Sequence, residues 1–281
     1  MLIVQTIAEL KACLNGEREQ GHSVGLVPTM GALHAGHASL VERSVKENDV
    51  TVVSIFLNPT QFNDKKDLER YPRTLEADCL LLEKCGAQVV FAPSVDEVYP
   101  EPDTRVFSYP PTDAVMEGAF RPGHFNGVCQ IVSKLFDYVE PDRAYFGEKD
   151  YQQICVIRRM VEDLKMDINI VACPVIREES GLARSSRNTL LSDEERQLAA
   201  HIYRVLSESR KQQMSVAETH DFVVREIDAI EGLKVQYFSI VDGLTLADVS
   251  TWDDAESVVG CITVYCGAVP IRLIDHIRYK L

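Results

Sequence analysis

Over its first 176 residues, the chain alternates short runs of apolar, mostly β-branched residues with segments that have the period of a helix. Strands are predicted at Ser23–Pro28, Val50–Phe56, Gln88–Ala92, Arg143–Phe146 and Asp167–Val171. Apolar helical faces lie between these strands and begin at Leu40, Leu75 and Ile154. The alternation implies right-handed crossovers and an α/β fold with a doubly wound parallel sheet. Ligands of such sheets bind beyond the carboxyl ends of the strands.

After residue 176 the pattern changes. Residues Arg177–Asn188 (REESGLARSSRN) are polar and are predicted to form a loop or hinge. Two helices and then three strands are predicted at Asp193–Glu208, Val216–Ala229, Val235–Val241, Val259–Cys266 and Ile271–Arg278. This spacing is typical of an antiparallel α+β module. We therefore expect one domain over residues 1–176 and a smaller α+β domain over residues 177–281, with a cleft between them.

The charge balance limits the partners of the chain. With 29 basic and 43 acidic residues, the net charge is −14, which disfavours a nucleic-acid-binding or lipid-binding protein but allows a local basic pocket for a small anion. No apolar run is long enough to cross a bilayer, and the first residues lack the pattern of a signal peptide. The eight cysteines form no CxxC pair and no zinc-type spacing. We therefore expect reduced thiols and a cytoplasmic protein.

The segment Pro28–His37 (PTMGALHAGH) joins the first of these strands to a helix. Exposed amides at a helix N-terminus attract anions, and the two glycines let a nucleotide approach the backbone. His34 and His37 are three residues apart, so on a first helical turn they face the same way and can donate hydrogen bonds to phosphate oxygens. A metal-binding pair is the alternative, which the lack of a nearby carboxylate or cysteine disfavours. Neither GxGxxG nor GxxxxGK(S/T) occurs, so a dinucleotide fingerprint and a Walker-type kinase are unsupported.

Four more motifs follow in the chain: Ser54–Phe62 (SIFLNPTQF), Arg121–Phe125 (RPGHF), Phe146–Gln153 (FGEKDYQQ) and Gly181–Asn188 (GLARSSRN). By themselves, the amides of Asn58 and Gln61 suit a hydroxyl-rich substrate or an ordinary turn, and Lys149 suits a phosphate or a solvated surface. Together with PTMGALHAGH, in this order over residues 27–188, the motifs resemble the pantothenate synthetase (pantoate–β-alanine ligase) family. That family belongs to the nucleotidyltransferase superfamily with the HxGH motif, relatives of class I aminoacyl-tRNA synthetases.

The resemblance implies a Rossmann-like sheet of the nucleotidyltransferase type that binds ATP and pantoate, followed by a smaller C-terminal domain. The implied reaction is the ATP-dependent condensation of (R)-pantoate with β-alanine to pantothenate, AMP and pyrophosphate, through a pantoyl adenylate. ATP is then a co-substrate, and Mg²⁺ accompanies its phosphates. The implied partners are these small molecules and a second copy of the chain, because the family suggests a homodimer.

The resemblance also assigns site residues. Those for ATP are Met30, Gly31, His34, Gly36, His37, Gly147, Lys149, Asp150, Ile176, Arg184, Ser185, Ser186 and Arg187. Those for the substrates are Asn58, Gln61 and Gln153, whereas Gln152 has no comparable claim. Those for catalysis are His34, His37, Lys149 and Arg187, with His37 as a proton donor. No residue is assigned to a metal.

The chain departs from the family pattern at three places. Ala35 stands where the family usually has a glutamate, and we expect little consequence because this position should face away. Arg184 replaces a methionine, which adds a charge near the phosphates. We favour a guanidinium that projects into solvent over one that contacts ATP, because the family works without a charge there. Residues Asn63–Leu68 (NDKKDL) replace a loop with glycine and proline, which predicts a different motion of a lid over pantoate.

Two other functions compete with this interpretation. An adenylyltransferase that keeps the nucleotide in its product, such as an NMN or phosphopantetheine adenylyltransferase, shares the HxGH start but does not predict the amide set. A tRNA-engaging, synthetase-like protein needs a basic tract, which this acidic chain lacks. Release of AMP that requires both pantoate and β-alanine separates the ligase from both alternatives.

Overall fold

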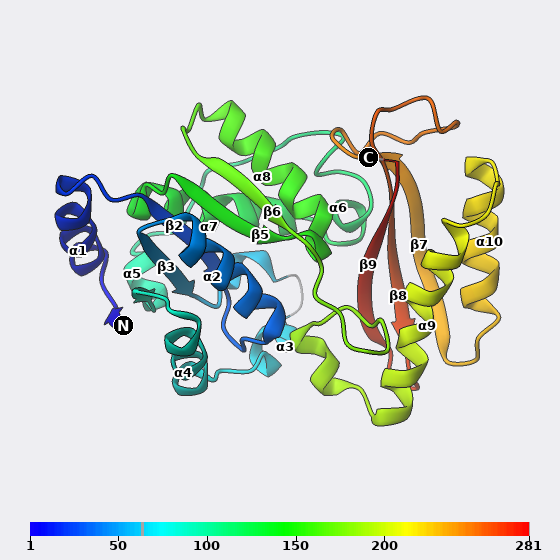
Figure 1. Cartoon of the computed structure of the whole chain (residues 1–281), viewed down its shortest axis with the longest axis horizontal. Helices are drawn as coiled ribbons and strands as arrows, with labels where there is room; N and C mark the ends of the chain where they lie inside the picture. The colour runs from blue at the N-terminus through cyan, green and yellow to red at the C-terminus, as the bar shows by residue number, and fades with distance from the viewer. Residues whose placement is uncertain (63–64, 281) are drawn as a thin grey trace.

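The structure is a computed structural model that describes residues 1–62 and 65–280, without the side chains of residues 65–67. Within these residues, the first sheet has six parallel strands in the order β1-β4-β3-β2-β5-β6 (Figure 1). The strands are β1 (Leu2–Val4), β2 (Val24–Thr29), β3 (Val50–Ile55), β4 (Val89–Phe91), β5 (Arg143–Gly147) and β6 (Asn169–Cys173). Strand β2 is central, with β3 on one side and β5 on the other.

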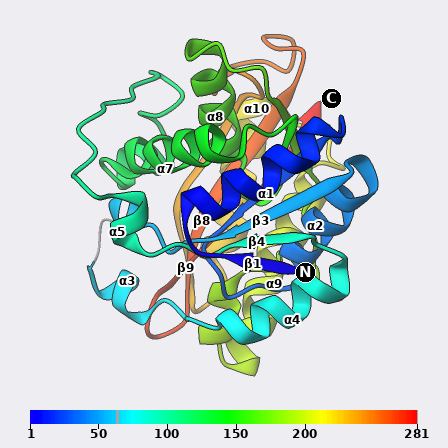
Figure 2. The same ribbon diagram turned by 90° about the vertical axis from the view of Figure 1, so that its left-hand side faces the viewer.

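Helices cover both faces of this sheet (Figure 2). Successive side chains of a strand point to opposite faces, so apolar strands present side chains that need covering on both faces. On one face, Leu26 and Phe146 share a core with α1 (Ile7–Glu19), α7 (His124–Val139) and α8 (Tyr151–Asp163). On the other face, Val27 and Tyr145 share a core with α2 (Ala35–Glu47) and α4 (Leu75–Cys85). The predicted doubly wound parallel sheet is confirmed.

One strand of the first sheet and two of the helices that cover it were not predicted. Strand β1 is only three residues long and lies at the sheet edge with Leu2 and Ile3 about half exposed, so it has little pattern of its own. Helix α1, which follows it, buries only Leu10 and Leu14. Helix α7 is buried along most of its length, although Asn126, Gln130, Lys134 and Asp137 recur at helical spacing along one side; this periodic signal was overlooked. The short helices α3 (Lys65–Arg70), α5 (Val95–Val98) and α6 (Glu117–Phe120) complete this part.

The second sheet is antiparallel and consists of β7 (Leu233–Asp242), β8 (Val258–Cys266) and β9 (Ile271–Lys280). Helices α9 (Asp193–Ser209) and α10 (Val216–Asp228) share a core with one face of this sheet, and Tyr151 and Cys155 of α8 pack on the other. The predicted α+β module is confirmed. We propose that the two domains meet at residue 176/177, because Leu182 already belongs to the core of the second sheet.

The predicted loop or hinge at 177–188 contains a small hairpin. Arg177 and Ala183 form an antiparallel bridge, and the carbonyl oxygen of Ile176 accepts a hydrogen bond from the N–H of Arg184 at 2.9 Å. The 3₁₀ turn η3 (Ser186–Leu190) follows. The segment is therefore held by its own backbone bonds. In the described part of the chain, no helix is long and apolar enough to cross a membrane.

A largely buried ion pair joins helix α6 to the second sheet. Glu117 of α6 accepts hydrogen bonds from both Nη atoms of Arg272 on β9, at 2.7 and 2.5 Å, and from the hydroxyl groups of Tyr237 and Thr263. Burial alone would raise the pKa of Glu117, but the bonds from Arg272 and Tyr237 hold that pKa at about 2, well below its ordinary value of 4.5. The carboxylate therefore stays charged and paired through the acidic range.

We expect Glu117→Gln to lower the free energy of unfolding by about 2–3 kcal/mol at neutral pH, because it leaves Arg272 without its charged partner. A carboxyl group whose pKa is lower in the folded than in the unfolded protein stabilises the fold fully at pH values above its unfolded-state pKa. This stabilisation disappears as the pH falls through the folded-state pKa. The difference between the two proteins should therefore be full above about pH 5 and shrink between pH 4.5 and 2. Urea unfolding across this pH range measures it, with the exposed Glu256→Gln as the control. A difference that does not vary with pH contradicts the assignment.

Candidate functional site

A pocket opens at the carboxyl ends of β2 and β5, which lie side by side in the sheet. This is the point where the strand order changes direction, the expected place for a ligand in an open α/β sheet. With the exception of Gly31, every site residue named from the sequence lines it: Met30, His34, Gly36, His37, Asn58, Gln61, Gly147, Lys149, Asp150, Gln153, Ile176, Arg184, Ser185, Ser186 and Arg187. The structure thus brings together segments that are more than 150 residues apart in the chain.

The two histidines begin helix α2. His34 is the N-cap, and its Nδ1 accepts a hydrogen bond from the N–H of Gly36, while Nδ1 of His37 accepts one from the N–H of His34. Because each Nδ1 accepts a bond, the proton of each neutral ring lies on Nε2. A Cβ at position 36 would lie 2.8 Å from the His34 ring, so this position requires glycine. The result is two fixed Nε2–H donors, with ring centres 4.1 Å apart.

Both rings are neutral at neutral pH. Burial, together with the nearby charges of Lys149 and Arg184, lowers the pKa of His34 to about 4. Burial, His34 and Lys149 lower the pKa of His37 to about 3. Two imidazoles this close to each other and to a lysine cannot both carry a charge without strong repulsion. The pair therefore supplies hydrogen-bond donors without adding positive charge.

Asp78 of α4 holds the loop that leads to these histidines. Its two carboxylate oxygens accept bonds from the N–H groups of Ala32 and Leu33, at 3.0 and 2.8 Å. Gly31 and Ala32 both have positive φ angles, and such a backbone needs outside support at a residue other than glycine. Sequence reasoning missed Asp78. The available signal was a carboxylate on the apolar face of a helix, three residues after Leu75, where a buried charge requires partners.

Asn58 is a scaffold for Gln61. Its side chain is 1% exposed, and its two amide hydrogens are directed to Oε1 of Gln61 and to the carbonyl oxygen of Gly127, both at 3.1 Å. Its Oδ1 accepts a bond from the hydroxyl of Tyr99 at 2.9 Å. These bonds give Asn58 a positioning role, and its expected direct contact with the substrate stays a prediction. His124, also missed from the sequence, donates from Nδ1 to the carbonyl oxygen of Gln61 at 2.9 Å.

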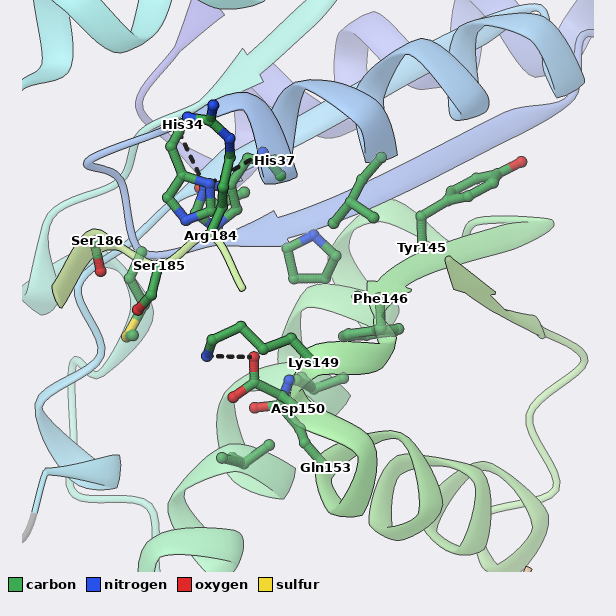
Figure 3. Close-up of a pocket in the computed structure, with 18 of the residues that line it drawn as sticks. His34, His37, Tyr145, Phe146, Lys149, Asp150, Gln153, Arg184, Ser185 and Ser186 are labelled. Atoms are coloured by element: carbon green, nitrogen blue, oxygen red, sulfur yellow. Dashed lines mark hydrogen bonds and ion pairs between the residues drawn. The ribbon is translucent and has the colours of Figure 1, made fainter. Parts of the chain in front are cut away.

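The turn after β5 faces the histidines across the pocket, as Figure 3 shows. Nζ of Lys149 lies 3.6 Å from a carboxylate oxygen of Asp150, which is the N-cap residue of α8 but makes no side-chain cap bond. Among the described residues, the side chain of Gln153 has no hydrogen-bond partner, and it lines the pocket. Gln152 is buried and bonds to the backbone of Thr112 and Val115 instead, as expected for a structural residue.

The segment after the hairpin closes the side of the pocket next to His34 (Figure 3). Oγ of Ser185 accepts a bond from the N–H of Arg187, so this hydroxyl caps the turn η3 and keeps its own hydrogen for a ligand. Arg184 is exposed, as expected, yet it lines the pocket and its charge acts on His34. Ala35 is exposed, as expected. Residues 63 and 64 lie outside the described part of the chain, so the lid expected at 63–68 stays a prediction.

The comparisons with known proteins agree with one another. The family model described as pantoate-beta-alanine ligase matches residues 2–278. The pantothenate synthetase of Bacteroides thetaiotaomicron is 64% identical, over 100% of this chain and 99% of its own. The crystal structure of pantothenate synthetase from Thermus thermophilus has a TM-score of 0.93 at 45% identity and covers both chains fully. A Francisella tularensis pantoate-beta-alanine ligase, described as complexed with beta-gamma ATP and beta-alanine, has a TM-score of 0.84 at 34% identity, with 99% and 98% coverage.

We expect His34 and His37 to remain uncharged, with the proton on Nε2, from pH 8 down to about pH 5. Their pKa values of about 4 and 3 lie below this range, and the backbone bonds to Nδ1 select the tautomer. Nitrogen NMR of labelled histidine measures both properties, with the exposed His22 as an internal reference. Protonation of either ring near pH 6.5, or a proton on Nδ1, contradicts this geometry.

Proposed function

The chain belongs to the pantoate–β-alanine ligase family, and on that premise we propose that it condenses (R)-pantoate with β-alanine through a pantoyl adenylate, using ATP. One observation carries the proposal. Neutral hydrogen-bond donors and fixed cations surround one pocket at the carboxyl edge of the sheet, together with two glutamine amides. Phosphates need such donors and cations, and a hydroxy acid suits the glutamine amides.

The ATP phosphates would lie at the start of α2. The N-terminal amides of this helix and the Nε2–H groups of His34 and His37 provide donors, and glycine at position 36 allows close approach. As pyrophosphate leaves, negative charge grows on its oxygens, and preorganised donors stabilise it without reorganisation. Because the pKa of His37 is about 3, the ring is uncharged at neutral pH and carries no imidazolium proton to transfer. We therefore infer that His37 donates a hydrogen bond, in place of the proton transfer that the family resemblance implies.

Positive charges act on the phosphates from two other segments. Lys149 comes from the turn after β5, and Arg184 and Arg187 come from the segment after the hairpin. Ser185 and Ser186 add hydroxyl groups at the same edge. A polyphosphate held between two such segments is placed for in-line attack at its α-phosphorus, so positioning and charge stabilisation provide the catalysis. Met30 and Ile176 supply apolar contacts for the nucleotide.

The two glutamines suit pantoate. Oε1 of Gln61 is held by Asn58, and its Nε2 is directed at Sδ of Met30 at 3.1 Å. A thioether is a weak acceptor, so an oxygen of the substrate can readily replace it. The amide of Gln153, which makes no hydrogen bond within the described part of the chain, faces the same pocket and can bind the hydroxyl and carboxylate groups of pantoate.

The proposed chemistry has two balanced steps. A carboxylate oxygen of pantoate attacks the α-phosphorus of ATP, and the bond from that phosphorus to the bridging oxygen breaks, releasing pyrophosphate. The amine nitrogen of β-alanine then attacks the acyl carbon, and the bond to the AMP oxygen breaks. The amine loses a proton as the amide forms. A mixed anhydride hydrolyses easily, so the 177–188 segment has the further task of excluding water between the steps.

We include Mg²⁺ in the proposal as a partner of the ATP phosphates. No group of three metal-binding side chains occurs in the described residues, and the donor set fits an ion that arrives with the nucleotide. Asp150, whose carboxylate is half exposed at the pocket, is the residue placed to hold it. The ion would supply charge neutralisation at the phosphates. A homodimer and a cytoplasmic location, both suggested by the family resemblance, complete the proposal.

We expect pantoate alone, without β-alanine, to support exchange of labelled pyrophosphate into ATP, because all the groups needed for adenylation are in place before the amine arrives. Gln153→Ala, His37→Ala and Lys149→Ala should each reduce this exchange, the last two by about 10²–10³-fold. Gln197→Ala, an exposed change on α9, is the matched control for Gln153. Exchange that appears only when β-alanine is also present would exclude the stepwise route. Near-normal exchange in a variant removes that residue from the mechanism.

We expect Arg184→Met to weaken ATP binding by about two- to fivefold at low salt and to have little effect at high salt. The guanidinium lies beside the pocket but is exposed, so it acts through a screened field. Titration of a non-hydrolysable ATP analogue at two ionic strengths measures this effect. The exposed Arg210→Met, which changes the net charge equally, is the control. An equal loss at both ionic strengths would instead indicate a direct contact, and no loss at low salt would show that the charge is irrelevant.

A further inference from the structure

Strand β9 of the second sheet contacts two parts of the candidate site that are far apart in the sequence. Nη2 of Arg278 lies 2.6 Å from Oε1 of Glu148, the residue just before Lys149. Asp275, three residues earlier on β9, accepts two bonds from the guanidinium of Arg177, at 2.6 and 2.9 Å. One strand thus holds both the turn that carries Lys149 and the hairpin that precedes Ser185.

The contact at Glu148 is well enclosed. The carboxylate of Glu148 is 18% exposed, and its second oxygen lies 4.0 Å from Nε2 of the buried His276 on β9. The guanidinium of Arg278 also lies over the ring of Tyr151, 5.3 Å from its centre. Because Tyr151 opens helix α8 directly after the turn, Arg278 contacts the residues on both sides of the Lys149–Asp150 pair. The backbone of the turn therefore has little freedom to tilt.

The contact at Arg177 is equally restrained. The carboxylate of Asp275 is 5% exposed, and the guanidinium of Arg177 stacks on the ring of Tyr203 at 3.5 Å. Arg177 also donates to the carbonyl oxygen of Gly181 at the tip of the hairpin. Because Arg177 pairs with Ala183 across the hairpin, the position of Arg177 determines where Ala183 lies. It thereby also places Arg184 and Ser185, which follow Ala183 directly in the chain.

We propose that β9 is the common support that sets the separation between Lys149 and the Ser185–Arg187 segment, with Arg278 and Asp275 as positioning residues for adenylation. The inference rests on the proposed function, because it assumes that both segments bind the phosphates of one ATP. Lys149 and Ser185 belong to different segments, and the parallel sheet carries only the first of them directly. The two ion pairs that β9 makes, through Arg278 and Asp275, connect these two segments. A small shift of either segment would then misalign the reacting atoms.

The test compares Arg278→Met with the unaltered chain in pantoate-dependent pyrophosphate exchange. We expect the rate of exchange to fall by about 10–100-fold, the size of effect that follows from misplacement by about 1 Å. Arg278→Lys, which restores the charge, should recover part of the loss. The double variant Glu148→Gln with Arg278→Met should be no slower than the slower of its two single variants, because both remove the same contact. The KM for β-alanine should not change, because the amine enters after the phosphates have been placed.

Ile277→Val on β9 is the matched control, because Ile277 is buried in the second core and makes neither ion pair. It weakens the same strand without removing the positioning contacts, and it should leave exchange unchanged. If Arg278→Met exchanges within threefold of the unaltered chain, or if Ile277→Val loses as much as Arg278→Met, the positioning role is wrong. The proposed function itself fails only if the unaltered chain shows no pantoate-dependent exchange, so the two failures are distinguishable.

Discussion

The whole site depends on one strained turn. Between β2 and α2 the chain passes through two consecutive residues with left-handed backbone angles, Gly31 and Ala32, at φ 83° and 52°. For alanine this conformation costs on the order of 1 kcal/mol, and the buried carboxylate of Asp78 offsets it with two backbone hydrogen bonds. Only this turn aims the N-terminus of α2 at the carboxyl edge of the sheet. The placement of both histidines, and with them the anion site, follows from it.

The electrostatics of the pocket follow from the same placement. Burial keeps His34 and His37 neutral, so the positive charge facing a polyphosphate comes from lysine and arginine side chains on other segments. Such a division is physically favourable, because an arginine or lysine remains charged at any physiological pH, whereas a buried imidazole provides a directed donor without a competing charge. The pocket can therefore attract ATP through its cations and orient it through its neutral donors. A chain with a net charge of −14 can thus offer an anion a local concentration of cations.

The sequence predicted the features that depend on local pattern. The five predicted parallel strands could be recognised because each is a short apolar run that suits burial on both faces of a sheet. Strand β1 was not predicted because Leu2 and Ile3 are about half exposed and the strand forms by pairing with the distant β4. Three of the five motifs follow the ends of β2, β3 and β5, and these motifs located the pocket. They did not reveal Asp78, whose partners lie 45 and 46 residues away. Nor did they show that the amide of Asn58 is used inside the protein, because hydrogen-bond partners are a property of the fold.

Several side chains of the site perform two tasks with different atoms. His34 and His37 use Nδ1 to cap the helix and keep Nε2 for a ligand, and Ser185 uses its oxygen to cap η3 and keeps its hydrogen. Ala35 and Arg184, two of the three places where a departure from the family pattern is expected, are both exposed. The double use of each ring means that truncating a histidine removes a helix cap together with a donor. Loss of activity alone therefore cannot separate support from chemistry at these residues, and the protonation state and tautomer of each ring are the properties that do.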